Sequence, residues 1–158
     1  MIENKEKFLA QDWHTFDQDE EKWWRSLLKD YRTQEDLIEA LNKKIPSEIA
    51  ELIQEYCIAN ENQIEQHTHA LMIFHSGQMY ANQWEYDKAI KQFEWVLKVY
   101  PQKVGEEYLI ATIHFLKGEQ SELNKIANSM KTETINYETV QRLQKWFWKT
   151  YLEAYSGI

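Results

Sequence analysis

Histidines and carboxylates are the side chains in this sequence whose spacing first suggests chemistry. His67, His69 and His75 fall within one predicted helix. Two metal ligands on a helix must be three or four residues apart to share a face. Glu65 and His69 have that spacing, His67 and His69 do not, and no third ligand lies beside them. We therefore rank a metal-dependent enzyme as a distant third hypothesis and expect neither a metal nor another cofactor.

The remaining reactive groups favour structural roles. Cys57, the single cysteine, lies on the inward stripe of a predicted helix, where a thiol behaves as a small apolar side chain. The acidic run from Asp17 to Glu21 lacks the closing glycine and distal glutamate of a calcium loop, and it suits the first turn of a helix. The sequence has no phosphate-binding glycine loop and no nucleophile elbow. We therefore predict a protein without catalytic activity.

Helices are the elements that must position these side chains. The chain has 158 residues, of which 43% are hydrophobic and 14% aromatic, which is enough for a substantial core. Four glycines and two prolines leave few helix breakers, and no alternating valine- or isoleucine-rich run predicts a strand. We expect a single all-α domain over residues 1–158, with about seven or eight helices.

Apolar residues spaced by three and four define most of these helices. The stretch from Ala70 to Pro101 predicts two amphipathic helices joined by a short turn. Pro101 ends the second helix, because proline has no N–H to donate and restricts the residue before it. Around this stretch we predict an N-terminal arm (1–16), flanking helices (17–60), a central hairpin (61–101), a second hairpin (103–131) and a C-terminal capping helix (136–155).

The central hairpin resembles a tetratricopeptide repeat, a helix–turn–helix unit of roughly 34 residues that stacks into a solenoid. The residues that match, at the mutual spacing of the family, are Gly77, Tyr80, Ala89, Phe93 and Pro101. Ser76 and Val96 depart from the family pattern, which usually has a large aliphatic residue at the first position and a small one at the second. The second hairpin keeps little more than Ile110 and Ala111. We therefore expect antiparallel hairpins stacked as a short tetratricopeptide-like solenoid or as an irregular bundle.

The resemblance implies a non-catalytic module that binds a peptide or partner protein in a groove lined by the first helix of each hairpin. The candidate groove residues are His69, Met72, Ile73, Ser76, Tyr80, Tyr108 and Thr112. Tryptophans outside the buried stripes are further candidates, because tryptophan buries a large area at low entropic cost. Trp95 on the central hairpin and Trp148 on the last helix are of this kind.

An acidic inhibitor, such as an immunity protein that neutralises a basic toxin or enzyme, is the second hypothesis. The formal net charge is −8, from 26 acidic and 18 basic residues. This charge permits a basic protein partner and argues against nucleic acid as the primary partner, because phosphate binding needs a basic face. The acidic surface in this hypothesis consists of Asp17, Asp19, Glu20, Glu21, Glu35, Asp36 and Glu39.

The compartment is predicted from the apolar segments of the chain. The first residues lack the apolar core of a secretory signal, and no apolar run approaches the length of a membrane-spanning helix. One cysteine excludes an intrachain disulfide. We therefore expect a cytoplasmic protein with no membrane partner, and a homodimer formed through the terminal aromatic residues is left open.

Overall fold

The computed structural model describes residues 5–12, 14–16, 18 and 41–157. Every regular element in these ranges is a helix, as the sequence predicts. The described helices are α1 (Lys5–Leu9), α4 (Ile45–Ala59), α5 (Gln66–Asn82), α6 (Tyr86–Val99), the 3-10 helix η1 (Pro101–Lys103), α7 (Glu106–Lys117), α8 (Gln120–Ser129), α9 (Tyr137–Lys145) and α10 (Tyr151–Ser156). The helices predicted between residues 19 and 40 lie outside the described residues.

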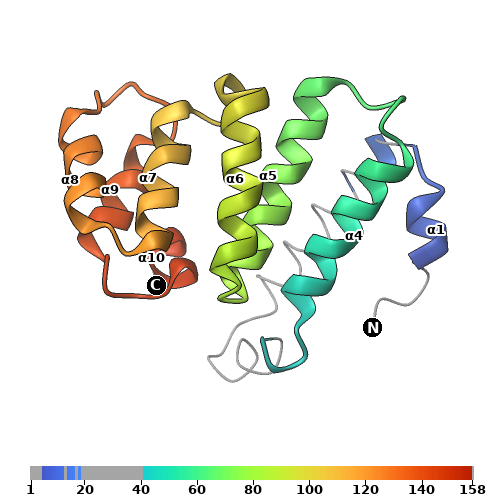
Figure 1. Cartoon of the computed structure of the whole chain (residues 1–158), viewed down its shortest axis with the longest axis horizontal. Helices are drawn as coiled ribbons and strands as arrows, with labels where there is room; N and C mark the ends of the chain where they lie inside the picture. Colours follow the sequence, from blue (N-terminus) through green and yellow to red (C-terminus); the bar gives the residue numbers. More distant parts are fainter. Residues whose placement is uncertain (1–4, 13, 17, 19–40, 158) are drawn as a thin grey trace.

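The helices are arranged in a row along the molecule (Figure 1). α4 and α6 both pack on α5, and α7 packs on α6, α8 and α9. α1 packs on α4 at one end of the row, and α10 returns from α9 to contact α5. α7 therefore has neighbours on several sides, which explains why its run from Tyr108 to Leu116 is apolar nearly all round.

The close packing of α5 on α6 depends on small side chains. A Cβ atom at Gly77 would lie 2.7 Å from a ring carbon of Phe93. Phe93 and Ala89 are both fully buried. Gly77 thus lets the α5 backbone approach the ring, as the sequence predicts, and α6 ends at Val99, two residues before Pro101.

Aromatic stacking attaches the N-terminal arm to α4. Phe16 is fully buried, and its ring lies 3.8 Å from the ring of Tyr56, centroid to centroid. The Tyr56 hydroxyl donates a hydrogen bond to the carbonyl oxygen of Gln11 at 2.7 Å. Burial raises the pKa of Tyr56 to about 12, so the hydroxyl keeps its proton at neutral pH. Cys57, the next residue, is buried as predicted.

The C-terminal segment contains two helices where the sequence predicted one over residues 136–155. α9 ends at Lys145, and α10 begins after Thr150. Thr150 Oγ1 accepts a hydrogen bond from the Glu153 N–H, and the Glu153 carboxylate accepts one from the Thr150 N–H. This capping box starts a new helix, which lets the chain turn back towards α5.

Candidate protein-binding surface

Most of the predicted groove residues are buried. Six of the seven are at most 7% exposed: Met72, Ile73, Ser76, Tyr80, Tyr108 and Thr112. These six are core residues in the structure, which corrects the prediction that they line an open groove. His69 is the one member of the set that remains partly exposed.

α4 covers one part of the predicted groove. Ser76 Oγ donates a hydrogen bond to the carbonyl oxygen of Ala50 at 3.1 Å. Gln54 Nε2 donates to the Tyr80 hydroxyl at 2.8 Å, and burial raises the pKa of Tyr80. Small and polar residues on α5 therefore serve the contact with α4, where the resemblance had assigned them to a ligand.

α10 covers the other part of the predicted groove. The Tyr108 hydroxyl on α7 and the Tyr151 hydroxyl on α10 lie 3.3 Å apart. Both side chains are fully buried, and desolvation raises the pKa of each, so the contact is a neutral hydrogen bond. Phe74 on α5 packs edge-on against Tyr108, with 5.8 Å between ring centroids. A prediction of one straight C-terminal helix could not foresee this cover.

Two of the predicted binding residues do meet at the surface. The rings of His69 on α5 and Trp95 on α6 lie 5.0 Å apart, with 46° between their planes. Trp95 is 36% exposed. Partial burial lowers the pKa of His69, against a smaller opposing effect of Glu61. The imidazole is therefore neutral at pH 7 and packs as a flat ring against the indole.

α4 and α6 run in the same direction, and polar side chains connect them across α5. Three contacts keep a nearly constant offset along the two helices: Ser47 with Glu85, Glu51 with Lys88, and Gln54 with Gln92. Beyond these contacts the C-terminal end of α4, which carries Ile58, inclines away from α6 (Figure 1). We call the surface formed by His69 and Trp95 the Trp95 patch.

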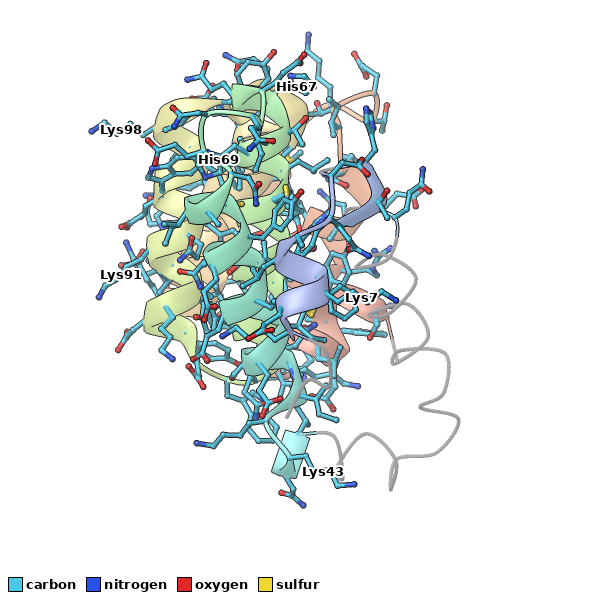
Figure 2. All side chains as sticks on the ribbon, turned by 90° about the vertical axis from the view of Figure 1, so that its right-hand side faces the viewer. Lys7, Lys43, His67, His69, Lys91 and Lys98 are labelled. Atoms are coloured by element: carbon cyan, nitrogen blue, oxygen red, sulfur yellow. The ribbon has the colours of Figure 1, made fainter. Side chains whose placement is uncertain are left out.

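Two lysines border the Trp95 patch on α6. Lys91 precedes Trp95 by four residues and Lys98 follows it by three, so the three side chains share one side of the helix. Figure 2 shows both lysines on the outer side of α6 and His69 between α6 and α4. Both lysines are exposed, and neither forms an ion pair with a described residue. The patch is therefore apolar and aromatic with a cationic edge.

Two further tryptophans are exposed near the opposite end of α6. Trp148, between α9 and α10, is 77% exposed, and Trp84, between α5 and α6, is 53% exposed. The two segments lie along the same lower edge of the row of helices (Figure 1), and the Tyr86 side chain contacts the backbone of Tyr151. Trp148 was among the predicted binding residues. Trp84 was not among the predicted binding residues, and its place in a turn was the signal that it would be exposed.

The candidate metal ligands do not gather into a cluster. Glu65 Oε2 lies 3.1 Å from His67 Nδ1, and the ring of His69 packs on the ring of Trp95. The residues that the structure describes contain no group of three or more His, Cys, Asp or Glu side chains arranged to hold a metal ion. His114 forms a contact of 2.6 Å with Glu119, which joins the end of α7 to the start of α8.

The acidic residues of the inhibitor hypothesis lie outside the described residues; they are Asp17, Asp19, Glu20, Glu21, Glu35, Asp36 and Glu39. Among the described helices, none combines the length and the apolar character needed to cross a membrane. Comparison of the chain with protein-family models, curated proteins and solved structures gave no match. The Trp95 patch is thus the main structural lead to function.

Proposed function

We propose that this chain is a non-catalytic protein-binding domain that docks a partner protein at the Trp95 patch. The observation that supports this most directly is the exposed contact of Trp95 with His69. Phe93 and Val96, close to Trp95 on α6, are fully buried. The apolar stripe of α6 is therefore satisfied within the fold, and Trp95 is an aromatic side chain beyond that stripe.

The exposed part of Trp95 contributes nothing to the stability of the isolated fold by burial. Apolar area transferred from water stabilises by about 25 cal/mol per Å², and about a third of Trp95 still faces water. A partner that covers Trp95 would release this free energy on binding. Tryptophan dominates many interfaces for this reason. The contact with His69 also restricts the indole before binding, which reduces the entropy lost on docking.

We further propose that α5 with α6, and α7 with α8, form stacked hairpins of a degenerate tetratricopeptide-like array. The fit of Gly77 against Phe93 and the packing of each pair support this. Such an array would normally bind ligands in its groove. In this chain α4 and α10 occupy the corresponding faces, so we assign binding to the side formed by α4 and α6.

A differential affinity purification from the native host tests the proposal. The bait is the full chain, either unchanged or carrying Trp95→Ala or His69→Ala. Trp148→Ala is the matched control, because Trp148 is also an exposed tryptophan, at 77%, and lies between α9 and α10. We expect a stoichiometric partner that the two patch variants lose and the control retains. A partner retained equally by Trp95→Ala would refute the assignment of binding to this patch.

A further inference from the structure

We propose that the segment docked at the Trp95 patch is acidic, an inference that rests on the protein-binding function proposed above. The observation is the pair of lysines beside Trp95. Lys91 and Lys98 are exposed, and among the described residues neither has an acidic partner. Lys88, one turn earlier on the same helix, is held by Glu85 at 2.5 Å. The unpaired cations of α6 therefore gather where the exposed aromatic side chain lies.

Carboxylates of α6 and α4 form ion pairs with lysines other than Lys91 and Lys98. Glu94, the residue before Trp95, forms an ion pair with Lys117 of α7 at 2.9 Å. On α4, Glu55 is paired with Lys5 of α1 at 2.6 Å. These two carboxylates are thus engaged with other lysines. Glu61, between α4 and α5, does act on His69, so the cationic edge of the patch belongs to α6 alone. This edge is cationic although the whole chain has a net charge of −8.

The spacing of the two lysines predicts the distance between the acidic groups of the ligand. Lys91 and Lys98 are seven residues apart on α6, which corresponds to about 10 Å along the axis at 1.5 Å per residue. Two carboxylates about seven residues apart on a partner helix span the same distance, as do carboxylates about three residues apart on an extended segment. An apolar side chain between the carboxylates would cover Trp95. The ligand class is therefore an acidic peptide segment with an apolar residue at its centre.

A single-stranded nucleic acid also combines negative charge with a flat group that stacks on tryptophan. The patch favours the peptide, because a net charge of −8 opposes the approach of a polyanion more strongly than that of a short acidic segment. Nucleic acid binding is therefore an outcome that the experiment must separate.

The probe is a labelled peptide of about 12 residues, roughly 18 Å long as a helix, in which leucines lie between glutamates. The control peptide has lysine in place of every glutamate. Fluorescence anisotropy gives the affinity for the full chain. The indole N–H signal of Trp95, identified by its loss in Trp95→Phe, reports the place of binding in an NMR titration. We expect the acidic peptide to bind and to shift this signal, and the basic peptide to do neither.

Charge reversal provides the matched test. The double variant Lys91→Glu with Lys98→Glu should weaken the acidic peptide at least tenfold and gain affinity for the basic one. Lys7→Glu with Lys131→Glu changes the net charge by the same amount at exposed positions on α1 and after α8, and neither lysine forms an ion pair with a described residue. This control pair should change the affinity less than threefold. Both double variants must first unfold cooperatively in urea, with a midpoint close to that of the unchanged chain.

Several outcomes would overturn the acidic assignment: equal affinity for both peptides, an unchanged Trp95 signal, an equal effect of the two double variants, or tighter binding of an oligothymidylate of matched charge. The affinity purification separates this failure from that of the proposed function. If the native partner depends on Trp95 and His69 while the acidic peptide fails, the acidic assignment is wrong and the protein-binding function stands. If that dependence is absent, the binding function itself fails.

Discussion

Trp84 allows backbone strain to be measured separately from the loss of a side chain. Its φ is +65°, in the left-handed region, where an L side chain costs roughly 1–2 kcal/mol and glycine has no such penalty. Trp84→Ala and Trp84→Gly both remove the indole, so the difference between them reports the backbone. We expect Trp84→Gly to be more stable than Trp84→Ala by about 1 kcal/mol.

Lys91 is the control position, where the order should reverse. It is exposed and lies inside α6, away from both ends. Glycine is about 1 kcal/mol less favourable than alanine in such a position. The glycine-minus-alanine difference in unfolding free energy should therefore change sign between Trp84 and Lys91, and the two sites should differ by roughly 2 kcal/mol.

Urea unfolding of the four variants, followed by far-ultraviolet circular dichroism, measures these free energies. Midpoints compare directly if the dependence on urea is the same for all four. Both Trp84 variants should be less stable than the parent chain, because about half of the indole is buried, and the comparison between them does not depend on that loss. A Trp84→Ala variant as stable as Trp84→Gly would refute the reasoning, since the observed φ would then carry no penalty.

Three further predictions concern packing, capping and titration. Gly77→Ala should lose about 1–3 kcal/mol in chemical denaturation, because the new Cβ would lie 2.7 Å from the Phe93 ring, and a second change, Phe93→Leu, should recover part of the loss. Thr150→Ala removes the N-cap of α10 and should lower the free energy of unfolding by about 1 kcal/mol. The Thr150 hydrogen bond lowers the pKa of Glu153 in the folded chain. This bond therefore stabilises the fold fully above the carboxyl pKa of the unfolded chain, and its stabilisation disappears as the pH falls through the lower folded pKa. The free energy of unfolding of Thr150→Ala should fall less steeply with acid than that of the parent chain. Burial lowers the pKa of His69, so His69 is protonated at a higher pH in the unfolded chain than in the folded one. The parent chain should therefore lose stability as the pH falls below about 6.5. His69→Gln should reduce the slope of unfolding free energy against pH in this range, and an unchanged slope would contradict the prediction.

The parts of the fold that depend on local pattern are predictable from the sequence. The buried stripe of α6 follows from the spacing of Ala89, Phe93 and Val96, all fully buried. Gly118 ends α7 with a φ of +72°, as expected for a glycine after an apolar helix. Gly77 is needed for the approach of α5 to α6. Each of these features is decided by residues within about two helical turns or by one neighbouring helix.

The cover over α5 and α7 depends on contacts that the sequence pattern does not specify. Ser76 and Tyr80 suit either a groove or a polar helix interface, and the contacts with Ala50 and Gln54 of α4 decide for the interface. The start of α10 does have a local signal, the Thr-x-x-Glu pattern at Thr150. The prediction of one helix over residues 136–155 did not use it.

The Trp95 patch follows from how α4 and α6 meet over α5. Polar contacts connect the two helices in register as far as Gln54 and Gln92. Each turn of α4 up to that point is joined to α6 by a hydrogen bond or an ion pair. At the next turn of α6 the contact passes to α5, where the ring of Trp95 lies 5.0 Å from the ring of His69 and about a third of Trp95 still faces water. Towards its C-terminal end α4 inclines away from α6 (Figure 1), which leaves the indole at the surface. The positions of His69 and Trp95 are set by α5 and α6, so the proposed partner would cover them without rearranging the fold.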